Sequence, residues 1–541
     1  MMPPLILVFM LVLHVLLWMR LSVKFVHLMQ LESYQNRMYV KALRRNLHTL
    51  LLPILAAGAL SLAAGGAVWL LIRDGFVAAV AAPFSTIAIG LLLVIMFAGR
   101  RQKKPLVYTA RVKRLLASVF VVSALYAWVA WALWGGLRPL VAFELVLAAG
   151  MPFVPVFVLL GAAVNYPFEQ HFKRRYFNEA KQKLAACDNL IKIGITGSFG
   201  KTSAKHMLGT ILQQRYKTLI TPQSYNTPMG VSRVIRENPV CDYEVFVCEM
   251  GARYKGDIRE LCDLVQPRYG LITSIGKQHL ETFKTLDTVI STKYELIEAL
   301  PENGCAFFPS DNEICLELFE KTAKNKALFG FDGQGRVLDM AVDEYQTGPE
   351  GSTFALIGQD GSKKYCSTRL LGRHNVQNIL GAACVAQKLG LTLDEIAQGI
   401  ALIEPVEHRL QLIQGANGVT VIDDAFNANP EGAEAALEVI ASFEGGKKII
   451  VTPGLVELGK EEEELNRAFG RSMAACVDEV ILVGGAMRTA PLLEGIEEAG
   501  FDREHIHVVA DLEGATAVIG RIARTGDVVL FENDLPDNYN G

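Results

Sequence analysis

The sequence lacks several patterns that would place it in a common class of protein. Its nine cysteines include no CxxC pair and no Cys/His cluster with the spacing of a zinc site, so we expect reduced and mostly buried thiols. The formal net charge is only −3, which gives no indication of a nucleic-acid partner. No internal repeat or low-complexity segment is present. Charged residues are scarce in one place only, the first third of the chain.

That charge-poor third contains about five apolar runs, and each is long enough to cross the roughly 30 Å hydrocarbon core of a bilayer as a helix. A cleaved signal peptide could account only for the first run, which follows no basic segment and ends in bulky residues, Leu17 to Met19. We therefore expect a membrane-embedded α-helical unit over residues 1–165. The runs cover residues 3–19, 47–72, 75–97, 115–137 and 139–164.

Basic residues between these runs predict a topology, because short cytoplasmic loops collect Lys and Arg. The loops after the first and third runs are rich in both, whereas the loops after the second and fourth hold little more than Arg73 and Arg138. Lys173 to Arg175 follow the fifth run. Five crossings would place residues 165–541 in the cytoplasm as part of a multi-pass protein of the cell (inner) membrane. An interfacial position for one weak run would break the alternation.

After residue 188 the pattern becomes that of an α/β protein, with short β-branched runs separated by helical stretches. We expect a central domain over 188–404, with a β-rich insertion at about 327–372, and a separate Rossmann-like domain over 405–541. The expected strands of the two domains include LIKIGITG, YEVFVCEMG, YGLITSIG and GCAFFPS, followed by VTVIDD, KKIIVTPG, EVILVGG, HIHVVAD and GDVVLFEN.

The segment GITGSFGKTS, residues 194–203, resembles a phosphate-binding loop between a strand and a helix. Gly197 and Gly200 would let backbone amides surround an anion, Lys201 could reach the phosphates, and Thr202 offers a hydroxyl to Mg²⁺. A strict GxxxxGK[ST] pattern requires glycine at position 195, where this chain has Ile195. The sequence therefore predicts a variant of that loop.

Three further residues are candidates because of where they fall. Glu249 and His279 follow expected strands, and Lys293 lies in an expected helix, STKYELIEAL. Taken singly, each is more typical of a structural or solvent-exposed residue than of a catalytic one. A functional role for them is supported by their combination, in this order, with the phosphate-binding loop.

Together these motifs resemble the Mur ligases of peptidoglycan synthesis, with the folylpolyglutamate synthases as relatives, over essentially all of residues 188–540. The resemblance implies a P-loop central domain that binds ATP and about two Mg²⁺ ions, a carbamylated lysine at Lys293, and an acyl-phosphate mechanism of amide-bond formation. It implies catalytic roles for Lys201, Lys293 and His279, metal binding by Thr202, Glu249, His279 and Lys293, and substrate contacts from Asn226 and Asn427. ATP contacts are implied for Gly197, Ser198, Gly200, Lys201, Thr202, Ser203, Asn375, Asn378, Arg409 and Asp423.

Within the family, the segments EMGARYKGDIREL, GKQHLETF, DDAFNANP and VELG resemble most the ligases that add D-alanyl-D-alanine to a UDP-muramoyl-tripeptide. Three departures leave both substrates open: the helical unit stands where the family has a UDP-sugar-binding domain, the last strand ends in the acidic FENDLPDNYNG instead of a Lys-Gly-Ser-Arg-like segment, and Asn466 replaces a histidine.

The partners expected are therefore a carboxylate-bearing peptide or a lipid-linked precursor, together with an amino acid or dipeptide. Alternatives are a Mur-like ligase acting on a lipid-linked or polymeric substrate, a membrane transport ATPase, and a non-catalytic scaffold. The near absence of charge within the spans disfavours transport. A non-catalytic scaffold has no physical need to keep five residues together: Lys201, Thr202, Glu249, His279 and Lys293.

Overall fold

The structure, a computed structural model, describes residues 4–72, 75–98, 105–134, 146–223, 225–348, 350–425 and 429–533. It divides the chain into two compact units, one reaching Phe172 and the other covering Lys173–Asp534. Each unit is described by itself.

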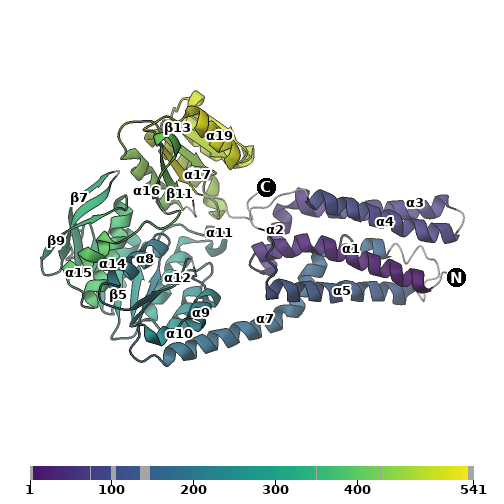
Figure 1. The fold of residues 1–541 in the computed structure, drawn as a ribbon, viewed down its shortest axis with the longest axis horizontal. Coiled ribbons are helices and arrows are strands. Elements are labelled where there is room, and N and C mark those ends of the chain that lie inside the picture. Colours follow the sequence, from purple (N-terminus) through teal and green to yellow (C-terminus); the bar gives the residue numbers. More distant parts are fainter. Residues whose placement is uncertain are drawn as a thin grey trace. The chain divides into compact units, whose positions relative to one another are not determined.

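The regular secondary structure described in the first unit is helical (Figure 1). Helix α1 packs against α4 and α5, and α3 packs against α4. The Trp18 ring is fully buried and meets the rings of Tyr126 and Phe157 at centroid distances of 5.5 and 5.8 Å. The elements are α1 (Pro4–Leu31), α2 (Asn36–Arg45), the π-helix η1 (Leu47–Leu51), α3 (Leu52–Leu71), α4 (Gly75–Ala98), α5 (Ala110–Trp134) and the first part of α7 (Val154–Ala185).

Among the described residues, three helical segments are long and apolar enough to cross a membrane: Val8–Leu31, Leu47–Val68 and Ala110–Ala132. The third apolar run of the sequence falls on α4, where a shorter apolar stretch covers Ala81–Phe97. The fifth run is interrupted, because residues 150–153 form turns before α7 begins, and its first part, 139–145, lies outside the described residues. The number of five crossings therefore stays a prediction.

The expected loop after the first run is shorter than the sequence suggested. Helix α1 continues to Leu31, so Arg20 and Lys24 lie on the helix and not in a loop. Pro and Gly are absent between residues 5 and 31, which lets the helix continue past its apolar part. Of the other predicted loops, 73–74 and 99–104 fall outside the described residues.

The second unit begins with a nine-stranded sheet in the order β2-β3-β1-β4-β5-β6-β7-β8-β9. Its strands from β2 to β7 are parallel, as expected for a doubly wound sheet. One face is covered by α8, α14 and α15, and the other by the end of α7 with α9, α10, α12 and α13 (Figure 1). The strands are β1 (Ile191–Thr196), β2 (Thr218–Ile220), β3 (Val245–Glu249), β4 (Tyr269–Ile272), β5 (Cys305–Pro309), β6 (Lys326–Gly330), β7 (Met340–Gly348), β8 (Gly351–Gly358) and β9 (Lys363–Thr368).

The helices around this sheet alternate with its strands along the chain. They are α8 (Lys201–Leu212), α9 (Pro228–Glu237), the 3₁₀ helix η2 (Val240–Asp242), α10 (Asp257–Val265), α11 (Leu280–Phe283), α12 (Leu286–Glu298), α13 (Glu313–Lys321), α14 (Arg373–Lys388) and α15 (Leu393–Ala401).

The β-rich stretch at 327–372 is an extension of this sheet. Strand β6 pairs in parallel with β5, and β7 pairs with β6 before the antiparallel strands β8 and β9 complete the edge. Alternating apolar residues of β8, among them Phe354 and Leu356, join the same hydrophobic core as α14. The local texture of the sequence indicated antiparallel pairing correctly, but not that it continues the central sheet.

A six-stranded sheet follows, in the order β10-β11-β15-β12-β13-β14, and it is parallel except for β10. Helices α16, α17 and α18 pack on one face, and α19 packs on the other. The elements are β10 (Gln411–Gln414), β11 (Thr420–Asp424), α16 (Pro430–Ala441), β12 (Lys448–Thr452), α17 (Glu462–Cys476), β13 (Glu479–Val483), α18 (Ala486–Glu498), β14 (Ile506–Val509), α19 (Leu512–Ile522) and β15 (Val528–Glu532), with short 3₁₀ helices η3 (Ala416–Gly418), η4 (Gly459–Glu461) and η5 (Arg503–His505).

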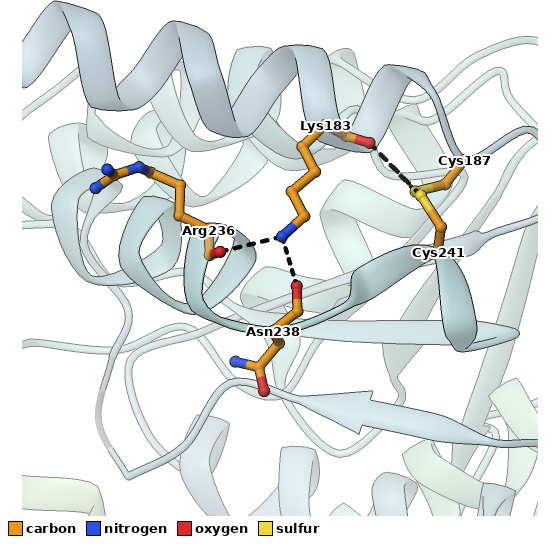
Figure 2. Close-up of a disulfide and its surroundings, with 5 residues drawn as sticks. All are labelled: Lys183, Cys187, Arg236, Asn238 and Cys241. Carbon is orange, nitrogen blue, oxygen red and sulfur yellow. Dashed lines mark hydrogen bonds between the residues drawn. A yellow bond between two sulfur atoms is a disulfide. The ribbon is translucent and has the colours of Figure 1, made fainter.

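A disulfide joins Cys187, just after α7, to Cys241 in η2, and this corrects the expectation that all thiols are reduced (Figure 2). Its Cα atoms are 5.0 Å apart. The two segments meet because the Lys183 ammonium, on α7, donates hydrogen bonds to the carbonyl oxygens of Arg236 and Asn238 at 3.0 and 2.7 Å. The other seven cysteines are free thiols, and all but one of these are buried.

Candidate active site

The phosphate-binding loop lies between β1 and α8, as the sequence predicted. Gly200 has a left-handed φ of 80°, and a Cβ there would come within 2.5 Å of the Asn378 side chain, so only glycine fits. The loop is held to the segment after β4 by a hydrogen bond from the Ser198 amide to the Ser274 carbonyl, at 2.8 Å. The helix start and its free amides thus form an anion-binding end.

Lys201 is the first residue of α8, and its ammonium donates a hydrogen bond to the Gly197 carbonyl at 2.6 Å. Burial lowers the pKa of Lys201 to about 8; the charge of Glu249 partly offsets this, and that of Arg409 adds to it. An entering phosphate would supply the negative charge that this buried cation lacks.

The hydroxyl-bearing residues of the loop have different surroundings. The Ser198 hydroxyl donates to the Gly276 carbonyl at 3.0 Å and accepts from the Gly276 amide, so it has a structural partner. Thr202 is half-buried, and Ser203 is buried in a small pocket that Asn375 and Arg409 also line.

Glu249 ends β3 and is buried beside the loop. Its carboxylate accepts hydrogen bonds from the Lys205 ammonium at 3.2 Å and from the Asn226 amide at 2.9 Å. Burial alone would raise the pKa of Glu249, but Lys205 and Lys201 outweigh it and hold the pKa below its usual range. Lys205, which the sequence analysis did not select, is thus the direct partner of an expected metal ligand, and Asn226 contacts that ligand too.

His279 has a left-handed φ of 49°, and its Nδ1 is hydrogen-bonded to the carboxylate of Glu457 in the VELG segment. Glu457 is also left-handed, with φ 65°. Two non-glycine residues in this costly conformation suggest that the contact is specifically maintained. Glu457 leaves Nε2 as the histidine nitrogen available to a ligand, a pairing of the kind that orients metal-bound histidines.

Lys293 lies on α12 and is almost completely buried, with 1% of its surface exposed. Burial is the main cause, and the Lys201 charge the second, of a pKa well below the usual value. Asp257 and Glu249 contribute in the opposite direction. The structure therefore brings Lys293, Lys201 and Glu249 into one electrostatic cluster.

The start of α14 supplies the predicted Asn375 and Asn378. The Asn375 amide donates to the Leu371 carbonyl at 2.8 Å, and Asn378 packs against Gly200. Two neighbours in the same motif carry unused polar groups: within the described residues, His374 Nδ1 and the amide of Gln377 have no hydrogen-bond partner. Such unsatisfied buried groups beside a phosphate loop suit the edge of a nucleotide base.

Arg409 lies just before β10, and Asp423 and Asp424 end β11. Asp423 accepts a hydrogen bond from His408 at 2.7 Å, whereas Asp424 interacts electrostatically with Arg409. Burial has the largest effect on the pKa of Arg409 and lowers it. The charges of Asp424, Glu249 and Glu532 act in the opposite direction. Arg409 thus lies within the electrostatic influence of the phosphate loop. Asn427 lies outside the described residues.

Asn466, which replaces a family histidine, has a structural role. Its side-chain oxygen accepts from the Leu455 amide at 2.8 Å, and its side-chain nitrogen donates to the carbonyls of Leu455 and Glu462. These three bonds hold the segment leading into VELG against α17.

A metal site here would need donors of several kinds. In the part of the chain that the structure describes, no three His, Cys, Asp or Glu side chains converge as a metal site. Glu249 and the Thr202 hydroxyl are oxygen donors of the kind that Mg²⁺ prefers, and Mg²⁺ commonly takes further oxygens from substrate phosphates. The donor set therefore fits Mg²⁺ bound together with a nucleotide.

The fold and this site define an ATP-dependent ligase, and the chain belongs to the Mur ligase family. Residues 195–386 match the Mur ligase middle domain, and residues 408–532 match the Mur ligase, glutamate ligase domain. The UDP-N-acetylmuramoyl-tripeptide–D-alanyl-D-alanine ligase of Escherichia coli is 33% identical over 313 residues, which are 58% of this chain and 68% of that protein. The Bacillus subtilis ligase of the same name is 28% identical over 63% of this chain and 72% of that protein.

The fold is also similar to a crystal structure of MurF from Acinetobacter baumannii. The match covers 68% of this chain and 78% of that protein, with a TM-score of 0.61 and 26% identity. These comparisons confirm the family and the α/β fold predicted from the motifs. The matched residues begin at 195, so the helical unit lies outside them.

Proposed function

We propose that this MurF-like ligase joins the carboxyl group of a muramoyl peptide to the amine of a dipeptide such as D-alanyl-D-alanine. The observation that carries the proposal is the convergence of Lys201, Glu249 and Lys293 beside the phosphate loop. The names of the relatives supply the substrate class.

The reaction proceeds in two steps. A substrate carboxylate oxygen bonds to the γ-phosphorus of ATP, ADP leaves, and an acyl phosphate forms. The neutral amine then attacks the acyl carbon, inorganic phosphate leaves with the bonding electrons, and the nitrogen gives up one proton as the amide forms. Lys201 and the loop amides hold the phosphoryl oxygens, and positioning of the two reactants provides much of the acceleration.

Mg²⁺, held by Thr202 and Glu249 with His279 nearby, would neutralise charge on the transferring phosphoryl group. Glu457 orients His279, and Asn226 with Lys205 holds Glu249 in place. These contacts fix the ligands before the nucleotide binds.

Carbamylation of Lys293 belongs to the same proposal. Burial lowers the pKa of Lys293, and this favours the neutral amine, which is the form that reacts with CO₂. The carbamate would bring a negative charge next to Lys201 and supply oxygen donors. Carbon-13 NMR of the protein in labelled bicarbonate tests this: a carbamate signal present in the wild type and absent in Lys293→Ala is expected.

We also propose that the helical unit is embedded in the cell membrane, with the catalytic unit in the cytoplasm. Large apolar side chains cover its surface, including Leu70, Leu92 and Ile95, which are 86, 67 and 68% exposed. Such a surface is unfavourable in water. A membrane unit outside the ligase domains also favours a lipid-linked acceptor as the second candidate.

The test uses the full chain in detergent or lipid nanodiscs with ATP, Mg²⁺ and a panel of UDP-muramoyl peptides or lipid-linked muramoyl peptides, with hydroxylamine as a trap. A hydroxamate of one acceptor class is expected, and its mass identifies the acceptor. Absence of hydroxamate with every acceptor would refute the proposed function.

A further inference from the structure

The end of helix α7 is attached to the end of helix α9 by polar contacts. The Arg236 guanidinium, in the last turn of α9, forms an ion pair with Glu179 at 2.8 Å and lies 3.9 Å from the centre of the Tyr176 ring. The Lys183 ammonium binds the carbonyl oxygens of Arg236 and Asn238 (Figure 2). Carbonyl groups at the end of a helix lack partners within it, so Lys183 satisfies them. Helix α7 therefore fixes the carboxyl end of α9.

The disulfide adds a covalent link at the same place. Cys187, which follows α7, is buried, whereas Cys241, in η2, is exposed. A small thiol can therefore reach the Cys241 sulfur from solvent, as thiol–disulfide exchange requires. Opening of the bridge does not need the unit to unfold.

The surroundings also suit the two reduced thiols. The Cys187 sulfur lies 3.2 Å from the Lys183 carbonyl oxygen, which can accept a hydrogen bond from the S–H group that reduction creates. The polar contacts of Lys183 and Arg236 with the other helix do not involve sulfur. Reduction therefore removes one constraint from the carboxyl end of α9 and leaves the non-covalent ones.

The segments on both sides of α9 lead to Glu249. Asn226 directly precedes the Thr227 cap of α9, and its side-chain amide donates to the Glu249 carboxylate at 2.9 Å. The Asn226 carbonyl accepts from the Gly251 amide, also at 2.9 Å. After α9, η2 leads into β3, whose last residue is Glu249. The position of α9 therefore affects how Asn226 and Glu249 meet.

The phosphate loop is attached to a different part of the sheet. Ser198 is hydrogen-bonded to Ser274 and Gly276, which follow β4. A shift of α9 should therefore disturb the Asn226 side of the site more than the nucleotide side.

We propose that Cys187 and Cys241 form a redox switch that controls how α9 presents Asn226 to the acceptor substrate. This inference rests on the proposed function and adds regulation to the same site. In the bridged state α9 is fixed and the contact between Asn226 and Glu249 is maintained. In the reduced state the carboxyl end of α9 is looser, and the acceptor binds more weakly. A cytoplasmic location favours a switch, because thiols there are kept reduced and the disulfides that do form are usually transient and redox-sensing.

Closure of the bridge uses a low-molecular-weight disulfide, such as glutathione disulfide, as the oxidant. The Cys241 thiolate attacks one sulfur of this disulfide and releases one glutathione thiolate. The Cys187 thiolate then attacks the Cys241 sulfur of the mixed disulfide and releases the second. The two protein thiols lose two protons and two electrons, and two molecules of glutathione form.

The inference is tested with the full chain in detergent, either reduced with a phosphine or bridged with glutathione disulfide. The mass of the protein after alkylation of its free thiols verifies each state. Rates of hydroxamate formation give the KM for the muramoyl peptide acceptor. We expect this KM to be about threefold to tenfold higher in the reduced state, because the hydrogen bond to Glu249 is weakened, with less than about a twofold change in the KM for ATP.

Two variants serve as references. Cys187→Ser combined with Cys241→Ser should behave like the reduced wild type under both treatments. Cys476→Ser removes a partly exposed free thiol at the end of α17 and should leave the redox response unchanged. The inference would be overturned if the wild type formed no bridge with glutathione disulfide, or if its acceptor KM were the same in both verified states.

Hydrogen exchange gives a second measure that needs no substrate. Amides of α9 should exchange faster in the reduced protein, whereas those of α8, which covers the opposite face of the sheet, should not change. Equal exchange of α9 in the two states would also overturn the inference. Absence of hydroxamate in both states refutes the proposed function, whereas hydroxamate formed with the same kinetics in both states refutes the switch alone.

Discussion

Replacement of Lys205 by methionine is the most direct test of how the metal-ligand end of the site is held together. The Lys205 ammonium and the Glu249 carboxylate are 3.2 Å apart, and both side chains are almost inaccessible, at 0 and 1% exposure. Methionine retains most of the apolar stem and removes the charge. Glu249 would then be a buried carboxylate without its nearest cation.

The magnitude follows from this geometry. At 3.2 Å and an effective dielectric constant of about 20, the attraction between the two charges is about 5 kcal/mol. Removal of one partner of a buried ion pair costs about 3–5 kcal/mol, because the other charge stays buried. We therefore expect Lys205→Met to lower the free energy of unfolding of the catalytic unit by about 3–5 kcal/mol.

The assay is urea unfolding of the full chain in detergent, followed by circular dichroism, with two reference variants. Lys205→Met combined with Glu249→Gln should recover much of the loss, because no unpaired charge is then buried. Arg233→Met breaks an exposed pair with Glu237, both side chains being 60% exposed, and should change stability by at most about 1 kcal/mol. If Lys205→Met were as stable as Arg233→Met, the buried pair would not hold Glu249 in place.

Three further outcomes are expected. Replacing Cys187 and Cys241 together by serine should lower stability by about 4 kcal/mol in oxidising buffer, because the bridge closes a loop of 54 residues, and should have no effect under dithiothreitol, by urea unfolding. Burial raises the pKa of Asp424 to about 6, and burial together with Asp424 raises the pKa of Glu532, so the native state binds more protons than the unfolded state and stability falls as the pH rises from about 4. This fall should be smaller in Glu532→Gln, which removes one of the two titrating groups, by thermal unfolding across pH. Glu457→Gln should weaken Mg²⁺ activation about 10–100-fold without altering the KM for the amine, by magnesium titration of the rate.

Local sequence patterns were sufficient to predict the strands that carry the candidate site. The β-branched runs before Gly197 and at Glu249 form β1 and β3, because short apolar segments between helices are typical of buried parallel strands. The phosphate loop was predictable for the same reason, since its glycines, its lysine and its position after a strand are all close in sequence. The three-residue strand β2 was not expected, because so short a segment carries no periodicity.

Partners distant in the sequence were not predictable from the motifs. Glu457 contacts His279 across 178 positions, and Lys205 meets Glu249 across 44. The Cys187–Cys241 bridge has a spacing shared with many unbridged pairs, so only the packing of α7 against η2 brings its sulfurs together. Each of these contacts depends on how elements pack, which residue identity alone does not determine.

The charge beside the phosphate loop explains why an anion is needed to complete this site. The ammonium groups of Lys201 and Lys205 face the single carboxylate of Glu249, so these three groups together carry one positive charge. Burial opposes that charge, because it lowers the pKa of both lysines. The phosphates of a bound nucleotide would supply the missing negative charge. Binding of the nucleotide and retention of the charged lysines should therefore favour each other.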